Sequence, residues 1–278
     1  MTYAQALRQA KDQLTAANKE LRVAELLLLH VSQLSNAELY ANLQTQMPQL
    51  MMEQWTALLT QHIEFDVPLQ HLTGEEMFFG YSFRVGPEVL IPRFETEELV
   101  EKVLALYDEQ FGYPVHVVDL GTGSGAIAIS LAKEELRMQV DAVDVSAAAL
   151  EVAKYNAEHL NASITFHQGS WCEPLSRTYD IVVANPPYIP VKESLPNEII
   201  NYEPHTALFG GDDGLDHHRT IYQCIKPHLN PRFLIAVEHG FQHAQAVQTM
   251  AQEAFPSARV WSEKDMQQKD RFTFVLQT

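Results

Sequence analysis

The sequence predicts an α/β protein with a mostly parallel seven-stranded sheet, preceded by a small all-helical domain. Three observations lead to this fold class. Beyond residue 98, short apolar runs typical of strands alternate with helical patterns, as in a parallel sheet covered on both faces. A glycine-rich loop joins the first of these runs to a helical pattern, and the chain ends in two strand-like runs with no helix between them.

Residues 1–64 form the predicted helical domain, because apolar side chains such as Leu7 and Leu14 recur at helical spacing. Residues 35–38 (Ser-Asn-Ala-Glu) have the form of a capping box, so a helix is expected to begin there. Pro48 stands where a first-turn proline would open another helix. That helix is expected to bury one stripe of side chains: Leu50, Met51, Trp55 and Leu58.

Residues 65–97 are interpreted as the connection to the larger domain, and they contain a predicted β-hairpin on either side of Gly80. The larger domain is expected to span residues 98–278. Its parallel strands are predicted at residues 115–119, 139–144, 163–167, 180–184 and 233–238. The terminal runs at 259–261 and 271–276 are expected to form an antiparallel pair.

Bulk composition restricts the function classes. The net charge is -17, with 36 acidic against 19 basic residues, which opposes binding to nucleic acid because phosphate contacts need Lys and Arg. No apolar segment is long enough to cross a membrane, and the N-terminus has no signal-like stretch, so a cytoplasmic protein is expected. A monomer is also expected. Cys172 and Cys224 are expected to be two buried, reduced thiols, and no residue set has metal-ligand spacing.

The loop from Gly121 to Gly125 (Gly-Thr-Gly-Ser-Gly) follows the first strand of the larger domain and predicts a Rossmann-like cofactor site. Its candidate residues are Gly121, Thr122, Gly123, Ser124 and Gly125. Glycines let the backbone turn tightly and approach a ligand where a Cβ would collide. The glycines alone also fit a dinucleotide-binding loop.

Flanking residues favour S-adenosylmethionine over a dinucleotide. Asp119, just before the loop, would repel a pyrophosphate but suits the ammonium group of a methionine moiety. Asp144 ends the second strand, where an acidic residue can accept both ribose hydroxyls. Its alternative role is a charge at a helix N-terminus, because Ser146 can cap the next helix. Trp171 is placed to pack on adenine, or else serves as ordinary core.

Asn185-Pro186-Pro187-Tyr188 follows a buried strand and is the predicted catalytic and substrate-binding loop. The prolines make the loop rigid and keep the Pro186 carbonyl out of a helix. The Asn185 side-chain oxygen and that carbonyl can accept both N–H bonds of a planar amide or amine, and Tyr188 can pack on its face. These residues predict an S-adenosylmethionine-dependent N-methyltransferase.

Together with residues 90–97 (Leu-Ile-Pro-Arg-Phe-Glu-Thr-Glu), these motifs resemble the protein-(glutamine-N5) methyltransferases of peptide-chain release factors, the HemK family. The likeness extends to Glu203-Pro204, residues 210–215 and Glu238-His239-Gly240. It implies methylation of the glutamine in the Gly-Gly-Gln loop of class I release factors, with the helical domain as a docking module. It also implies that Asn185 contacts the cofactor. The chain departs from the family pattern at Phe94, Glu95 and Ser170.

Other functions share part of this pattern. Glutamine methyltransferases of a ribosomal protein, and adenine-N6 methyltransferases of nucleic acids, have the same tetrapeptide. The acidic charge opposes the nucleic-acid enzymes. A nicotinamide-dependent dehydrogenase would fit the glycines and Asp144 but leaves the tetrapeptide at Asn185–Tyr188 without a role. A binding module without catalysis would also leave it unexplained.

Overall fold

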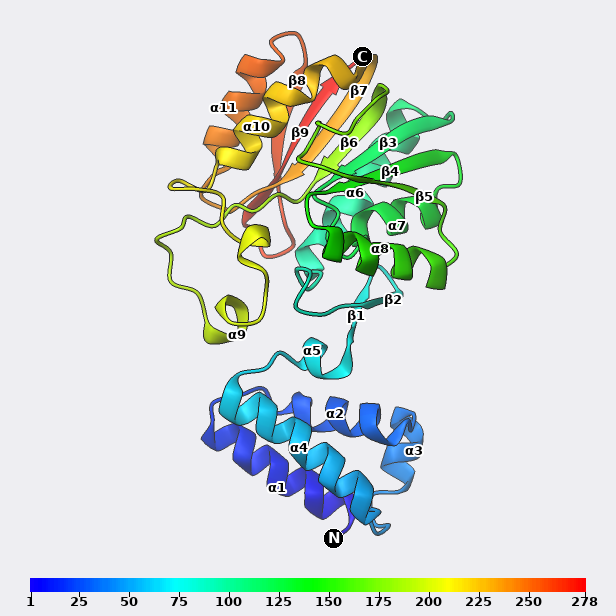
Figure 1. Cartoon of the computed structure of the whole chain (residues 1–278), viewed down its shortest axis with the longest axis vertical. Coiled ribbons are helices and arrows are strands. Elements are labelled where there is room, and N and C mark those ends of the chain that lie inside the picture. The colour runs from blue at the N-terminus through cyan, green and yellow to red at the C-terminus, as the bar shows by residue number, and fades with distance from the viewer. The chain divides into compact units, whose positions relative to one another are not determined.

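The computed structural model describes residues 1–278 and divides the chain into two compact units (Figure 1). The first unit, the helical unit, contains Met1–Glu75 together with Leu195–Tyr202. The second, the sheet unit, contains Glu76–Ser194 and Glu203–Thr278. A short internal segment of the chain therefore packs with the N-terminal helices, which local sequence patterns do not indicate.

The helical unit is built from short amphipathic helices around one apolar core. They are α1 (Tyr3–Ala16), α2 (Arg22–Ser32), α3 (Asn36–Ala41), α4 (Gln49–Phe65), α5 (Leu69–Thr73) and the single turn α9 (Asn197–Ile200). The indole of Trp55 is buried in this core and donates its Nε1–H to the Ala24 carbonyl at 2.9 Å. Lys19 on the loop after α1 pairs with Asp66 and with Glu198 of α9.

The predicted helix starts in this unit are confirmed, with one error in the expected buried stripe. Ser35 caps α3, and Glu38 returns a hydrogen bond to the Ser35 backbone, as a capping box requires. Pro48 occupies the N-cap position of α4. Leu50, however, is 67% exposed, because the buried face of α4 runs through Trp55, Leu59 and His62.

The sheet unit contains the predicted seven-stranded sheet, in the order β5-β4-β3-β6-β7-β9-β8 (strands labelled in Figure 1). Its strands are β3 (Val115–Leu120), β4 (Met138–Asp144), β5 (Ile164–Gln168), β6 (Tyr179–Ala184), β7 (Leu229–Glu238), β8 (Arg259–Lys264) and β9 (Asp270–Gln277). Strands β5, β4, β3, β6 and β7 pair in parallel, whereas β9 pairs antiparallel with β7 and β8. The predicted parallel sheet with an antiparallel terminal pair is confirmed.

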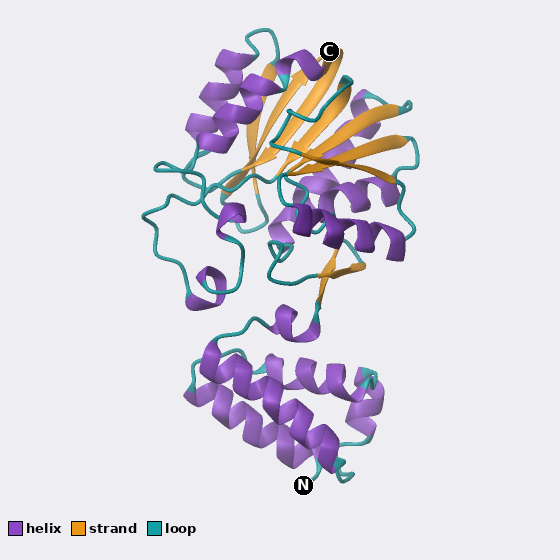
Figure 2. Ribbon diagram, in the orientation of Figure 1, coloured by secondary structure: helices purple, strands orange, loops and turns teal.

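Helices cover both faces of this sheet (Figures 1 and 2). One face carries α6 (Phe94–Gln110), α7 (Ala126–Glu134) and α8 (Ala147–His159), and the other carries α10 (Asp216–Cys224) and α11 (Ala244–Ala254). Side chains alternate between the two apolar cores, so that Val117 belongs to one and Val118 to the other. Both faces are therefore dry, and only the loops at the strand ends are free to form a site.

A two-stranded hairpin, β1 (Glu75–Phe78) and β2 (Tyr81–Arg84), precedes α6 as expected. Phe94–Glu97, at the end of the expected connecting segment, form the first turn of α6. Two short 3-10 helices, His205–Ala207 and Lys226–His228, complete the regular structure. None of the helices combines the length and apolar character needed to span a membrane.

Candidate active site

The carboxyl ends of the parallel strands meet at one edge of the sheet, and the loops leaving them surround a cavity of about 400 Å³. Six predicted site residues line it: Gly121, Gly123, Asp144, Trp171, Asn185 and Pro187. Asp144 is the last residue of β4, and the other five come from the loops after β3, β5 and β6. Residues far apart in the sequence thus converge where open α/β sheets bind ligands.

The glycine-rich loop depends on a left-handed backbone conformation. Gly121, Gly123 and Gly125 have φ values of +78°, +54° and +84°, which side chains rarely tolerate. At Gly121 a Cβ would lie 3.2 Å from the Trp171 ring, and at Gly125 it would lie 2.8 Å from Ile129 Cδ1. The loop can therefore bring its backbone to the cavity only with glycine at these positions.

Asp144 joins the glycine loop to the start of α8. Its Oδ2 accepts the Gly123 N–H at 2.8 Å, and its Oδ1 accepts the Ser146 N–H at 2.9 Å. Ser146 in turn caps α8 through Ala149 N. Burial raises the pKa of the Asp144 carboxyl, although these backbone donors oppose the shift. Each oxygen keeps a second lone pair for a ligand hydroxyl, so the capping role and ribose recognition are compatible.

Asp119 lies beneath the glycine loop and does not line the cavity. It is fully buried, and its Oδ2 accepts the Thr122 hydroxyl at 2.6 Å, while its Oδ1 has no hydrogen-bond partner. Burial raises the pKa of this carboxyl to about 7. Thr122 and Ser124 are also buried. These three predicted residues hold the loop from below, and only the unpartnered Oδ1 remains free for another donor.

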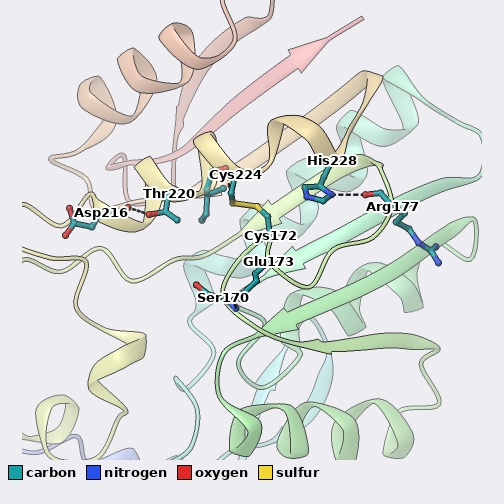
Figure 3. The surroundings of a disulfide bond; sticks show 9 residues. Ser170, Cys172, Glu173, Arg177, Asp216, Thr220, Cys224 and His228 are labelled. Carbon is teal, nitrogen blue, oxygen red and sulfur yellow. Dashed lines mark hydrogen bonds between the residues drawn. A yellow bond between two sulfur atoms is a disulfide. The ribbon is translucent and has the colours of Figure 1, made fainter.

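Trp171 forms a wall of the cavity and packs against His217 of α10, with ring centroids 5.2 Å apart. The next residue, Cys172, forms a disulfide with Cys224 at the end of α10 (Figure 3). The expectation of two reduced thiols is therefore wrong. The two cysteines are 52 positions apart, and only the packing of α10 against the loop after β5 brings them together.

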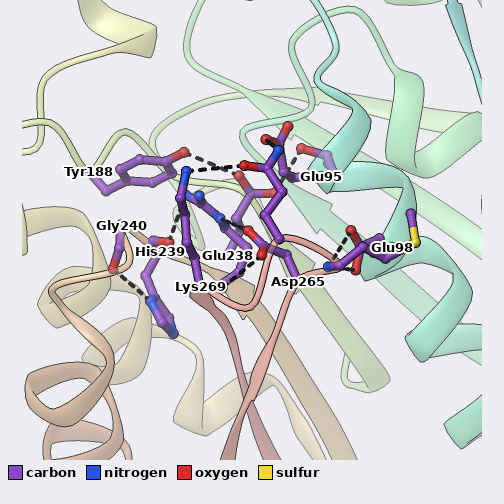
Figure 4. A network of polar contacts seen from close by, with 12 residues as sticks. Glu95, Glu98, Tyr188, Glu238, His239, Gly240, Asp265 and Lys269 are labelled. Atoms are coloured by element: carbon purple, nitrogen blue, oxygen red, sulfur yellow. Dashed lines mark hydrogen bonds and ion pairs between the residues drawn. The ribbon is translucent and has the colours of Figure 1, made fainter.

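Asn185 lies at the carboxyl end of β6 and belongs to a chain of hydrogen bonds that reaches into the protein. Its Nδ2 donates to Thr96 Oγ1 at 3.1 Å, and that hydroxyl donates to Glu238 Oε2 at 2.8 Å. Tyr188 donates its hydroxyl to the other oxygen, Glu238 Oε1, at 3.3 Å (Figure 4). Burial raises the pKa of Glu238 to about 7 and that of the Tyr188 hydroxyl above its usual range.

The Asn185–Tyr188 loop is enclosed by a second glycine-rich segment. Ile189 N–H donates to the Leu208 carbonyl, and Gly210 N–H donates to the Ile189 carbonyl. A Cβ at Gly210 would come within 2.5 Å of the Pro187 carbonyl oxygen. Pro186 is buried and Tyr188 partly buried. The glycines of residues 210–214 therefore allow this segment to lie directly against the backbone of the tetrapeptide.

Arg93 and Glu203 form an ion pair on another side of this region. Glu203 is buried and also accepts the Ile91 N–H at 3.2 Å. Residues 90–97 and the Glu203-Pro204 motif are thereby held together, more than a hundred positions apart in the sequence. The pair fixes the segment that contributes Leu90 and Pro204 to the cavity wall.

Comparison with known proteins identifies the family. The PrmC N-terminal domain model matches residues 5–74, and the Methyltransferase small domain model matches residues 96–205. Release factor glutamine methyltransferase of Bacillus cereus is 38% identical over 277 residues, covering 98% of each chain. The Bacillus subtilis protein of the same name is 39% identical, covering 99% of this chain and 98% of its own. The chain belongs to the release factor glutamine methyltransferase family.

A solved methyltransferase from Pyrococcus furiosus shares the fold, with a TM-score of 0.53 and 17% identity, covering 71% of this chain and 89% of its own. A Thermus thermophilus 16S rRNA methyltransferase, solved with AdoMet and guanosine, has a TM-score of 0.52 and 16% identity. It covers 73% of this chain and 50% of its own. At these identities the likeness establishes only the fold.

The sequence alone does not reveal several residues of this candidate site. Thr96 and Glu238 were noticed only as parts of motifs, not as partners of Asn185. Glu238 ends β7 as Asp144 ends β4, so an acidic residue at a strand end was the signal that could have found it. The remaining cavity wall comes from segments that carry no such signal, including Ala149, Thr206, Phe209 and His217.

Proposed function

We propose that this chain transfers a methyl group from S-adenosylmethionine to the side-chain amide nitrogen of the glutamine in the Gly-Gly-Gln loop of class I release factors. The observation that carries the proposal is the position of Asn185. It lines the cavity at the end of β6 and donates its Nδ2–H to buried Thr96. The side-chain oxygen of the same amide is then available to a substrate. Membership of the family supports this substrate class.

The residues around the cavity suit S-adenosylmethionine. A cavity of about 400 Å³ can enclose a ligand of this size. Asp144 offers carboxylate lone pairs for ribose hydroxyls, and Trp171 offers an aromatic face for adenine. Gly121 and Gly123 let the backbone approach the ligand, and the buried Asp119 contributes indirectly, because its carboxylate holds Thr122 and with it the loop. Ser170, also on the wall, occupies the adenine end without a carboxylate.

When bound, S-adenosylmethionine supplies an electrophilic methyl group, and the protein has to prepare the acceptor nitrogen. An amide nitrogen is a poor nucleophile because its lone pair is delocalised into the carbonyl. Asn185 Oδ1 and the Pro186 carbonyl accept its two N–H bonds, which orients the lone pair and stabilises the positive charge that develops on nitrogen. Pro187 and Tyr188 contact the planar group. As the bond from nitrogen to the methyl group forms, the bond from sulfur to that methyl group breaks and leaves S-adenosyl-L-homocysteine. The nitrogen then releases one of its two protons, which is acidic once nitrogen carries positive charge. Catalysis is mainly positioning and electrostatics.

We also propose that residues 1–64 of the helical unit dock the folded release factor, while residues 98–278 carry out the methyl transfer and residues 65–97 connect the two parts. Supporting this, α3 and α4 expose large apolar side chains, Tyr40 at 58% and Leu50 at 67%, which are common at protein-binding surfaces. The enzyme acts as a monomer in the cytoplasm, where translation termination takes place.

Incubation with labelled S-adenosylmethionine and a purified class I release factor tests the proposal. Label is expected in the factor, and not in a variant whose loop glutamine is alanine. Labelling of both proteins alike would place the methyl group elsewhere. If a ribosomal protein or nucleic acid were labelled and the release factor were not, the proposed substrate would be wrong. The proposed chemistry of the Asn185–Tyr188 loop would still stand.

A further inference from the structure

At the cavity wall, Asn185 meets two buried side chains that come from other elements and do not line the cavity. Thr96 lies in the first turn of α6, Asn185 follows β6, and Glu238 ends β7. Asn185 Nδ2 is 3.1 Å from Thr96 Oγ1, which is 2.8 Å from Glu238 Oε2. Thr96 and Glu238 are 4% and 1% exposed, so water does not provide alternative partners for them.

The direction of these hydrogen bonds follows from the number of protons available. When Glu238 is ionised it has no proton and can only accept, so in that state the single Thr96 hydroxyl proton must point at Glu238. The Thr96 oxygen is then left with lone pairs and can only accept from Asn185. That bond requires the NH₂ side of the Asn185 amide, so the side-chain oxygen must face the other way.

We infer that Thr96 and Glu238 are positioning residues that set the orientation of the Asn185 amide, so that its oxygen is presented to the substrate nitrogen. The inference rests on the proposed role of Asn185 in accepting a substrate N–H. An amide turned by 180° would present its own NH₂ to the NH₂ of glutamine, two donors without an acceptor. The pair Thr96–Glu238 thus makes the site selective for a hydrogen-bond donor such as a primary amide.

The groups around Glu238 determine whether it carries the charge that this scheme needs. Arg271 of β9 favours the ionised carboxylate, and Tyr188 donates to it, whereas Glu95 of α6 opposes ionisation. Arg271 is itself held by Asp265 at 3.2 Å. The dominant effect is burial, which favours the neutral acid. The positive charge of Arg271 and two hydroxyl donors are the local features that stabilise the ionised form.

Thr96→Val removes the hydroxyl while keeping the shape of a buried, branched side chain. We expect kcat with release factor to fall roughly tenfold or more, with the affinity for S-adenosylmethionine unchanged. Thr96→Ser, which retains the hydroxyl, should restore kcat to near the wild-type value. Thr273→Val is the matched control, because Thr273 is also fully buried and bonded, to His239 and Ser262. Its kcat should match that of the wild type.

A double-mutant cycle with Asn185→Ala separates positioning from general damage. If Thr96 acts through Asn185, adding Thr96→Val to Asn185→Ala should produce no further loss of kcat. An additional tenfold loss in that background would overturn the inference. So would full activity of Thr96→Val beside an inactive Asn185→Ala enzyme, and this result would leave the proposed function intact. Full activity of Asn185→Ala would instead overturn the proposed role of the loop.

Glu238→Gln provides a second test that does not depend on Thr96→Val folding. A glutamine offers one acceptor and one donor in place of two acceptors, so the Thr96 hydroxyl is no longer obliged to point away from Asn185. We expect a lower kcat with unchanged cofactor affinity. A Glu238→Gln enzyme with wild-type kcat would contradict the inference, because orientation would then not need the carboxylate.

Discussion

Gly214 lies so close to Tyr188 that a Cβ at position 214 would come within 2.3 Å of the Tyr188 carbonyl oxygen. The φ of Gly214 is also +76°. Gly214→Ala is therefore expected to displace the catalytic loop and lower kcat, in addition to costing about 1–3 kcal/mol in the free energy of unfolding. Gly112→Ala is the control, because it has φ +66° but nothing within 4 Å of the added Cβ. Gly112→Ala should lose stability, measured by thermal melting, but keep its kcat. A fully active Gly214→Ala enzyme would show that the close contact between residue 214 and the Tyr188 carbonyl is unimportant for activity.

Asn185→Ala should keep its fold and bind S-adenosylmethionine with much of the wild-type affinity, yet turn over about a hundredfold more slowly or worse. The reason is that Asn185 holds the nucleophilic nitrogen in the proposed mechanism, so its loss should affect the chemical step. Single-turnover methylation of the release factor measures this step directly. A near-wild-type rate constant would remove Asn185 from the mechanism.

Asp144→Ala should weaken binding of S-adenosylmethionine by about 1–3 kcal/mol, because charge-assisted hydrogen bonds to ribose are lost. The Gly123 N–H also loses its acceptor, which loosens the loop. Isothermal titration calorimetry measures the change, and a nicotinamide dinucleotide serves as the control ligand that neither protein should bind. Tight dinucleotide binding would support the alternative reading of the glycine loop.

The strands and the glycine loop could be predicted from the sequence because the spacing of apolar residues and the preferences of turn residues depend only on neighbouring positions. The apolar runs ending at Leu120 and Ala184 indicate buried strands. Gly121 and Gly125 have positive φ values, a backbone conformation that only glycine adopts readily. The Asn185 contacts could not be predicted, since Thr96 is 89 positions away and meets it only after α6 packs on the sheet. The disulfide could not be predicted for the same reason, because Cys172 and Cys224 are 52 positions apart and meet only in the folded protein.

The pH dependence of stability should report on Glu238, whose pKa burial raises from an ordinary value of 4.5 to about 7. A raised pKa means that the folded state holds the proton more tightly than the unfolded chain, so the stabilising contribution is full below pH 4.5 and is lost as pH rises through about 7. Asp119 contributes in the same direction. The free energy of unfolding of Glu238→Gln should therefore fall less than that of the wild type between pH 5 and 8. Urea titrations at each pH measure it, and parallel curves would contradict the shift.

Activity should move in the opposite direction to stability across this window. The ionised Glu238 is the form that orients Asn185, so kcat should rise with an apparent pKa near 7. This rise of kcat with pH should be absent in Glu238→Gln, because the glutamine side chain does not ionise. If the variant showed the same rise of kcat with pH, the titrating group would be a residue other than Glu238.

Reduction of the Cys172–Cys224 disulfide should destabilise the sheet unit and weaken cofactor binding, because the bridge ties the loop carrying Trp171 to α10 (Figure 3). Disulfides that close loops of this kind contribute about 2–4 kcal/mol to stability. The melting temperature and the Kd for S-adenosylmethionine are measured with and without dithiothreitol. Cys224→Ser should resemble the reduced wild type and ignore the reductant. If dithiothreitol changed neither the melting temperature nor the Kd of the wild-type protein, the disulfide would contribute to neither stability nor cofactor binding.

The docking role of the helical unit can be tested without truncating the chain. Removing residues 1–64 would strip Asp66 and Glu198 of the ion pairs made by Lys19, so a deletion would confuse docking with unfolding. Leu50→Glu instead places a charge on an exposed position of α4 and should raise KM for the whole release factor several-fold. KM for a short Gly-Gly-Gln peptide should not change, because the peptide is too short to reach a docking surface. Leu136→Glu, at a leucine 89% exposed on the sheet unit, is the matched control. Equal KM values for the whole factor in all three enzymes would exclude the exposed face of α4 from docking.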